Sequence, residues 1–195
     1  MVVKVIIAKG GFLMKKQVRQ FEQFSMASPF NADIDTMKSP TYGEMSIEQV
    51  CERIVDFING EKEKGHSKFK IAVGTDSQAF ATTKVVAVIA VHCEGYGGIY
   101  FYKVLRFPKL TIHDKILNET VLSLNLATKI TPILESLHVF DDENVGFQVH
   151  CDVGESGDTN KYIGEITGMV KACAYECVIK PYSFAASGIA NKYSK

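Results

Sequence analysis

Two stretches of the chain alternate apolar and polar positions and then end in an aspartate. Residues 69–78 place four core-forming side chains on one face, and small residues followed by Asp76 on the other. The four are Phe69, Ile71, Val73 and Thr75. Residues 145–152 repeat the pattern and end in Asp152. Because successive side chains of a strand point to opposite faces, both stretches are predicted to be β-strands.

The two aspartates are expected to meet. Ala72 and Gly74, ahead of Asp76, leave room for another element to approach that face closely. In an open α/β sheet the ligand crevice lies beyond the carboxyl ends of neighbouring strands. If the two strands are parallel neighbours, Asp76 and Asp152 converge there. We therefore interpret the chain as organised around this pair of strands.

Turn residues and helical spacing predict what precedes the first of these strands. Residues 31–40 are loop-like, and Ser39–Gly43 has the composition of a turn. Ser46 is expected to cap a helix that ends near Asn59 and Gly60.

A long helix and several shorter elements follow. Thr111 is predicted to open a helix that runs to about Leu137, with Ile112 on its apolar face and Glu119 at the border of that face. Asp158 or Thr159 is expected to cap the next helix. The other predicted elements are strands over 84–93, 99–107 and 176–180, and a last helix from about residue 183 that holds Asn191.

The order of these elements predicts an α/β domain. The first three strands are joined by short turns and are expected to form an antiparallel meander. The later strands need helical crossovers and are expected to add in parallel. We assign the domain to residues 38–195 and an N-terminal extension to residues 1–37, in which 2–8 fit a strand and 14–24 fit a short helix.

The composition limits the function classes. The 195 residues carry no net charge, so the whole chain gives no electrostatic argument for nucleic acid. Five cysteines are scattered without a C-x-x-C pair, which favours buried free thiols over a zinc site. The apolar start is short and interrupted by Lys4, so neither a signal peptide nor a membrane span is expected. We expect a soluble, cytoplasmic protein with no membrane partner.

The acids on the two strands and the long helix suit phosphodiester chemistry. That chemistry needs an activated water and a neutralised leaving oxygen, and two divalent ions about 4 Å apart supply both. Mg²⁺ or Mn²⁺ held by carboxylate oxygens fits this role. Asp76 is predicted to bridge the ions, Glu119 to hold one and Asp152 the other. The simpler interpretation is that both aspartates are turn residues and that Glu119 is a surface residue.

Five segments carry a resemblance to a known family. They are SPTYGEMSIEQV (39–50), IAVGTDSQ (71–78), LNETV (117–121), VHCDVG (149–154) and KPYSFAASGIANKYSK (180–195). Together they resemble the bacterial YkuK family of ribonuclease H-like proteins over residues 38–195. The resemblance implies a ribonuclease H-like fold with a five-stranded mixed sheet, strand order 3-2-1-4-5, flanked by helices.

The resemblance also implies a fourth metal ligand on the last helix. Active ribonuclease H-like nucleases generally place an acid or a histidine there, and the matching position holds Asn191. An amide oxygen binds Mg²⁺ without charge, so the second ion is expected to bind weakly. The predicted substrate contacts are Ser77, Gln78, His113 and Lys115.

Three functions stay open at this stage. The first is a metal-dependent nuclease or related phosphoryl-transfer enzyme acting on nucleic acid. The second is a non-catalytic ribonuclease H-like module that binds nucleic acid or protein. The third is a phosphate-binding ATPase, because actin-like ATPases share the fold, although they use two such domains. A faint basic track supports a nucleic-acid partner; it consists of Lys103, Arg106, Lys109, Lys115, Lys180, Lys192 and Lys195.

Overall fold

The computed structural model describes residues 32–79 and 82–194. Its strands are β1 (Thr36–Ser39), β2 (Gly43–Ser46), β3 (Phe69–Ala79), β4 (Thr83–Cys93), β5 (Gly97–Phe107), β6 (Val145–His150) and β7 (Glu176–Val178). Its helices are α3 (Ile47–Glu63), α4 (Ile112–Ser136), α5 (Ile163–Ala172) and α6 (Asn191–Ser194), with short 3-10 turns η1 (Val139–Asp141) and η2 (Asn160–Tyr162) and the π-helical segment η3 (Phe184–Ala190). The strand and helix predicted within residues 2–24 lie outside the described residues.

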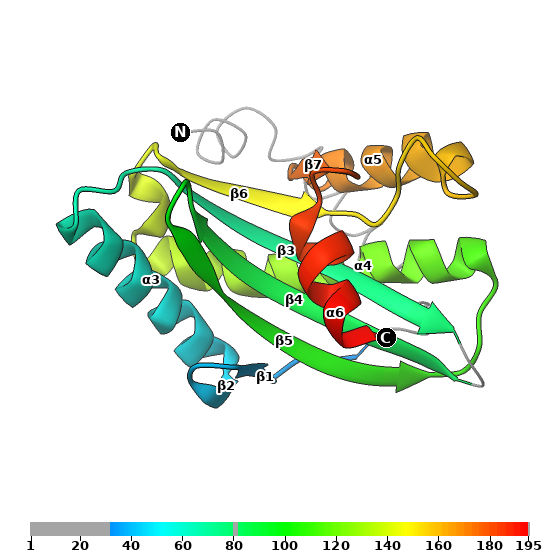
Figure 1. The fold of residues 1–195 in the computed structure, drawn as a ribbon, viewed down its shortest axis with the longest axis horizontal. Helices are drawn as coiled ribbons and strands as arrows, with labels where there is room; N and C mark the ends of the chain where they lie inside the picture. The colour runs from blue at the N-terminus through cyan, green and yellow to red at the C-terminus, as the bar shows by residue number, and fades with distance from the viewer. Residues whose placement is uncertain (1–31, 80–81, 195) are drawn as a thin grey trace, which may run out of the picture.

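The strands form one mixed sheet of seven, in the order β2-β1-β5-β4-β3-β6-β7 (Figure 1). β3, β4 and β5 are an antiparallel meander, and β6 and β7 add in parallel. The five strands β5-β4-β3-β6-β7 therefore confirm the predicted order 3-2-1-4-5 and the α/β class. No helix in the described part of the chain has the length and apolar character needed to cross a membrane.

The sheet has two strands more than the five predicted. β1 and β2 form a hairpin around the turn after Ser39, and β1 pairs with β5 through Lys38 and Tyr102. The loop prediction for residues 31–40 is wrong over Thr36–Ser39, because a strand of four residues is too short to show an alternating pattern. Met37 is completely buried. Its side chain and that of Ile34 belong to the main core, so the packed unit includes residues ahead of position 38.

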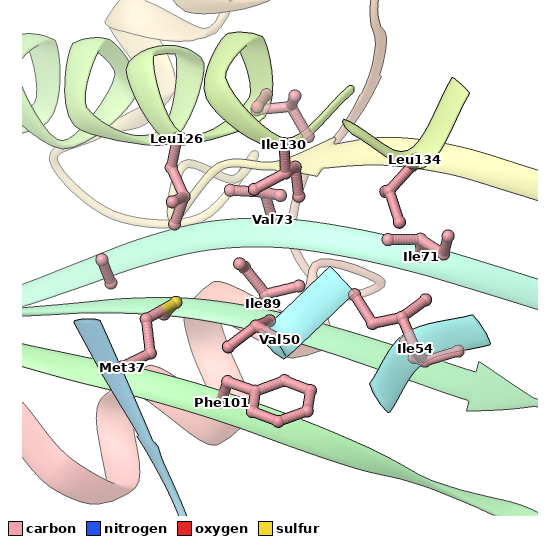
Figure 2. Close-up of a cluster of buried hydrophobic side chains, with 14 of the residues drawn as sticks. Met37, Val50, Ile54, Ile71, Val73, Ile89, Phe101, Leu126, Ile130 and Leu134 are labelled. Carbon is pink, nitrogen blue, oxygen red and sulfur yellow. The ribbon is translucent and has the colours of Figure 1, made fainter. Parts of the chain in front are cut away.

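One face of the sheet packs against α3 and α4, and Figure 2 shows the centre of this layer. The labelled side chains come from β1 (Met37), α3 (Val50, Ile54), β3 (Ile71, Val73), β4 (Ile89), β5 (Phe101) and α4 (Leu126, Ile130, Leu134). Burial of each large apolar side chain contributes about 1.5–3 kcal/mol. This layer fixes α4 against β3. It therefore also fixes the position of Glu119, on α4, along β3.

Both long helices begin where predicted, but α3 ends later. Ser46 and Gln49 form a reciprocal capping box at the start of α3. The helix passes Gly60, which costs only about 1 kcal/mol in a helix interior. It ends instead at Glu63, and Gly65, two residues further on, adopts a φ of +90°.

The long helix α4 departs from its predicted face at one position. Thr111 caps it by accepting a hydrogen bond from the backbone N–H of Asp114. Ile112, predicted on the apolar face, is 47% exposed, because the first turn projects beyond the layer it packs on. The helix continues through Pro132 and ends at Ser136.

The other face of β3 and β4 is covered by η3 and α6, which cross in front of these strands in Figure 1. Gly74 permits this approach: a Cβ there would lie 2.9 Å from the backbone nitrogen of Ala186. The small side chains in this layer are Ala72, Ala90, Ala185 and Ala190. The close approach predicted from the small residues of β3 is thus confirmed, and it places the end of the chain beside Asp76.

Candidate functional site

The two strand-terminal aspartates lie at the same level of the sheet. In the parallel ladder between β3 and β6, Gly74 is the partner of His150. Asp76, within β3, and Asp152, just beyond the end of β6, each lie two residues past this pair, and neighbouring strands are about 4.8 Å apart. The parallel pairing inferred from the sequence therefore brings both acids to one edge.

An open cavity of about 400 Å³ lies at this edge. It is lined by Asp76, Ser77, Gln78, Lys115, Asp152, Lys180, Ser187 and Asn191. Besides Asp76, the set contains five of the residues predicted for the site: Ser77, Gln78, Lys115, Asp152 and Asn191. The set combines two carboxylates, two amides and two ammonium groups, so the cavity is suited to a charged ligand.

Asp76 is buried and held by the C-terminal helix. The hydroxyl of Ser194 donates a hydrogen bond to Oδ2 of Asp76 at 2.7 Å. Burial is the main reason that the pKa of Asp76 is raised; the Ser194 hydrogen bond opposes the shift, and the charge of Asp152 adds to it. A cation in the cavity would relieve both the desolvation and the repulsion between the two acids.

Asp152 is paired with a lysine that sequence reasoning did not assign to the site. Lys180 Nζ lies 2.9 Å from Oδ2 of Asp152. The backbone N–H of Lys180 donates to the carbonyl of Val153, and a Cβ at Gly154 would lie 2.9 Å from Cβ of Lys180. A glycine at 154 therefore lets the lysine stem run alongside the end of β6.

Glu119 is placed next to the cavity rather than on its lining. The hydroxyl of Ser77 donates a hydrogen bond to Oε1 of Glu119 at 2.6 Å, and Lys115 Nζ lies 3.5 Å from the same oxygen. Burial raises the pKa of Glu119 to about 8, and the nearby Lys115 offsets this only in part. The carboxyl group lines a crevice shared with Asp152 that has no room for water.

The three acids are thus neighbours without forming one tight cluster. Asp152 borders both the cavity and the crevice, Asp76 borders the first and Glu119 the second. Their carboxylate oxygens do not all lie within 4.8 Å of one another. The ligand roles assigned to these acids from the sequence therefore stay predictions, with Asp152 at the centre of the arrangement.

The predicted substrate contacts divide into two groups. Ser77, Gln78 and Lys115 line the cavity. The Ser77 hydroxyl also donates a hydrogen bond to Glu119, and the Lys115 ammonium donates one to the backbone carbonyl of Ser77. His113 lies elsewhere, with Nε2 3.1 Å from Oε2 of Glu165 on α5. His113 lies in the first turn of α4 and faces α5. The sequence alone did not predict this contact.

His150 and Thr159 complete the surroundings of the site. His150 is a buried, hydrogen-bonded core residue: Nδ1 accepts from the N–H of Ala185 at 3.2 Å, so Nε2 carries the proton and faces Gln148. Burial lowers the pKa of His150 to about 4. Thr159 is the N-cap residue of η2, which leads into α5, but its hydroxyl makes no capping hydrogen bond and instead accepts one from the N–H of Gly154.

Two residues of this site could not be found from spacing. Ser194 reaches Asp76 across 118 positions of sequence, and its neighbours give no sign of a buried role. Lys180 belongs to the basic track, and its only local signal is its place as the last residue of a predicted parallel strand. Both depend on how the last segment packs over Gly74.

The donor set fits a hard divalent cation. Asp76, Asp152 and Asn191 offer oxygen atoms to one polar cavity, and oxygen ligands are those that Mg²⁺ and Mn²⁺ prefer. The Lys180 ammonium already sits against Asp152 as an internal cation, so this corner of the cavity favours positive charge. Glu119, whose Oε1 accepts a hydrogen bond from Ser77, fits a second ion only in its deprotonated form.

Comparisons with known proteins agree with this architecture. Residues 49–195 match the family model described as "Ribonuclease H-like". The chain is 30% identical to "Uncharacterized protein YkuK" of Bacillus subtilis (strain 168) in an alignment of 162 residues that covers 78% of this chain and 92% of the relative. No solved structure matches the chain significantly. The chain therefore belongs to the ribonuclease H-like family and is similar to YkuK of Bacillus subtilis.

Proposed function

We propose that the protein is a divalent-metal-dependent nuclease, or a related phosphoryl-transfer enzyme, that acts on nucleic acid at the cavity beyond β3 and β6. One observation carries the proposal. Asp76, Asp152 and Asn191 line a single open cavity at the carboxyl ends of two parallel neighbouring strands. Open α/β sheets bind their ligands at this position.

Asp76, Asp152 and Asn191 would hold Mg²⁺ or Mn²⁺ through their side-chain oxygens. When bound, such an ion polarises a phosphoryl oxygen and lowers the pKa of a bound water. The protein's own part is to fix the ligands, and Ser194 does so for Asp76. Glu119 is the proposed ligand of a second ion, which is expected to bind more tightly at high pH because Glu119 must first lose its proton.

The substrate class follows from the charges around the acids. Lys115 and Lys180 bring two ammonium groups to the same cavity. Phosphate groups are bound by such cations, and backbone phosphates supply most of the affinity of proteins for nucleic acids. In the proposed complex Lys180 leaves Asp152 and pairs with a phosphate of the substrate.

A cleavage assay on labelled single- and double-stranded DNA and RNA tests the proposal. Mn²⁺ is titrated with the wild type, Asp76→Asn and Asp152→Asn, together with Asp56→Asn as a matched control on α3, where the side chain of Asp56 is 62% exposed. Cleavage should fall at least about 100-fold in the two site variants, as when a group stabilising the transition state is removed. It should be unchanged in the control.

The melting temperature gives a second readout that needs no substrate. An ion that binds only the folded protein raises the melting temperature. That shift should be present in the wild type and Asp56→Asn and lost in Asp76→Asn. A metal-dependent shift and cleavage that both survive in Asp76→Asn would place the ion elsewhere and refute the proposed site.

A non-catalytic binding module is the second candidate, favoured by one feature of the site. Each acid already has a partner: Ser194 for Asp76, Lys180 for Asp152 and Ser77 for Glu119. Such a cluster is satisfied without an ion. Oligonucleotide binding that is unchanged by a chelator and by Asp76→Asn, with no cleavage, would favour this candidate over the enzyme.

A further inference from the structure

Three side chains with metal-binding atoms meet at the other end of β3 from the candidate site. A carboxylate oxygen of Glu61, a ring nitrogen of His66 and Sγ of Cys93 all lie within 4.8 Å of one another. Within residues 32–79 and 82–194, no other group of three such side chains meets this limit. Cys93 is the partner of Phe69, the first residue of β3, so the cluster is separated from Asp76 by most of that strand.

The end of α3 brings Glu61 and His66 together. The N–H of Gly65 donates to the carbonyl of Lys62 at 2.9 Å, and the N–H of His66 donates to that of Glu61 at 3.1 Å. These two hydrogen bonds define a Schellman motif. In this motif the side chains at the positions of Glu61 and His66 contact each other and are usually apolar. Here the contact is polar, with Nδ1 of His66 2.7 Å from Oε2 of Glu61.

The sheet supplies the third side chain. Cys93 is the last residue of β4, and the N–H of Glu94 donates to the carbonyl of Lys68 at 3.0 Å. The Cys93 side chain is a fully buried free thiol. Tyr96 stacks on the His66 ring with centroids 3.4 Å apart. A helix end, a strand end and a stacked ring therefore hold the three groups in place.

We propose that Glu61, His66 and Cys93 form a binding site for Zn²⁺ or another thiophilic divalent cation. Nitrogen, sulfur and oxygen are the donors that Zn²⁺ takes, at about 2.0–2.3 Å. Tetrahedral coordination at those lengths separates the ligand atoms by about 3.3–3.6 Å. The group is therefore close to the required size, and the Glu61–His66 contact of 2.7 Å has to open only slightly. Three protein ligands leave a fourth position for water or an external ligand.

The contacts that compete with an ion are weakly held. Lys64 Nζ lies 2.7 Å from Oε1 of Glu61, but the Lys64 side chain is 64% exposed and can turn into solvent. Two anionic ligands, a carboxylate and a thiolate, balance the charge of one divalent ion. The thiol proton leaves on binding, as with other zinc thiolates. This site differs in kind from the oxygen-only donors Asp76, Asp152 and Asn191, which suit Mg²⁺ or Mn²⁺.

Cobalt absorption tests the site in the full chain after treatment with a chelator. Co²⁺ bound to a thiolate gives a sulfur-to-metal charge-transfer band that oxygen ligands do not give. The band should appear in the wild type, be displaced by Zn²⁺, and disappear in Cys93→Ser. His66→Gln and Glu61→Gln should each weaken Co²⁺ binding at least tenfold, since even outer partners of metal ligands affect affinity by 10–100-fold.

Two controls match these variants. Cys173→Ser removes another free thiol, and Asp76→Asn removes the central acid of the candidate site; both should keep the band at wild-type strength. If Cys93→Ser fails to fold, His66→Gln decides the question. The absence of the band at equimolar Co²⁺, or its persistence in Cys93→Ser or at full affinity in His66→Gln, overturns the proposal and leaves the cluster as a helix-end contact.

Discussion

Lys180 Nζ lies 2.9 Å from Oδ2 of Asp152, so the acid that follows β6 is paired with a lysine from the segment after β7. The Lys180 side chain is 41% exposed and that of Asp152 is 17% exposed. Both line the candidate cavity. The ammonium therefore occupies a position where the proposed function requires a metal ion, and the ion must compete with it.

Replacing the lysine separates these two roles. Lys180→Met is expected to tighten Mn²⁺ binding about 3–10-fold, or about 0.7–1.4 kcal/mol, because Asp152 loses its internal cation. The same change should weaken binding of an oligonucleotide, because a phosphate contact is lost. Calorimetry measures the first effect and fluorescence anisotropy the second. Lys38→Met, at an exposed position of β1, is the matched control. Unchanged Mn²⁺ affinity in Lys180→Met would show that the ion does not bind at Asp152.

The raised pKa of Glu119 predicts a pH-dependent stability of the metal-free protein. The unfolded carboxyl ionises near pH 4.5 and the folded one near 8, so stability from protonated Glu119 is lost as the pH rises between these values. From about pH 6.5 to 8.5 the loss is on the order of 2 kcal/mol. Glu119→Gln should remove it. Urea unfolding with a chelator present measures the difference.

The chosen pH range excludes a second group that acts in the opposite direction. His150 has its pKa lowered to about 4, so the stability from its neutral form is lost only as the pH falls from 6.5 toward 4. Glu155→Gln, at an exposed loop position, serves as the control for Glu119→Gln. Equal pH slopes in Glu119→Gln and the wild type would contradict the assigned pKa.

The sequence predicts the central sheet well because its signals are local. Alternation in β3 and β6, glycines at the β4–β5 turn and the Ser46 cap each depend on residues near one another. The parallel pairing that brings Asp76 and Asp152 together follows from the element order. Its confirmation in the ladder from Phe69 to Gly74 shows that topology alone can predict which two aspartates lie at the same edge of the sheet.

The parts that were missed depend on packing between distant segments. Neither strand of the β1–β2 hairpin is long enough to alternate visibly, and its place beside β5 is fixed by Met37 entering the core. The partner of Glu119 was not predicted, because the turn of α4 directs its carboxyl group to the hydroxyl of Ser77. His113 was expected at the substrate and instead meets Glu165. The position of a residue in the helical pattern predicts which side of the helix its side chain lies on, but it does not predict which side chain of another element it contacts.

Gly74 is expected to be essential for the position of the C-terminal segment. A Cβ at this residue would lie 2.9 Å from the backbone nitrogen of Ala186 and 3.1 Å from the carbonyl oxygen of His150, and neither can move independently of its segment. Gly74→Ala should cost about 1–3 kcal/mol, as overpacking in a core does. It should also weaken metal binding, because η3 leads directly into α6, which carries Asn191 and Ser194. Chemical denaturation and Mn²⁺ calorimetry measure the two effects.

A glycine with free space around it provides the control. A Cβ at Gly168 on α5 would meet no atom within 4 Å. Gly168→Ala should be neutral or stabilising by up to about 1 kcal/mol, since alanine favours the helix. If Gly74→Ala were as stable as Gly168→Ala and bound Mn²⁺ normally, η3 would not lie on β3 as described.

Asn191 separates a weak nuclease from a module without catalysis. It lines the cavity with Asp76 and Asp152, so Asn191→Asp adds a third carboxylate at that edge. Without metal the added charge should destabilise the fold through repulsion. With Mn²⁺ it should increase the affinity for the more weakly bound ion and raise cleavage, and a tenfold gain in rate corresponds to only about 1.4 kcal/mol of barrier.

Asn59→Asp on the exposed side of α3 is the control. Melting curves and cleavage are compared across a metal titration for the wild type, Asn191→Asp and the double variant that also carries Asp152→Asn. If the wild type and Asn191→Asp are equally inert and neither binds a second ion, the cavity binds nucleic acid or protein without catalysis.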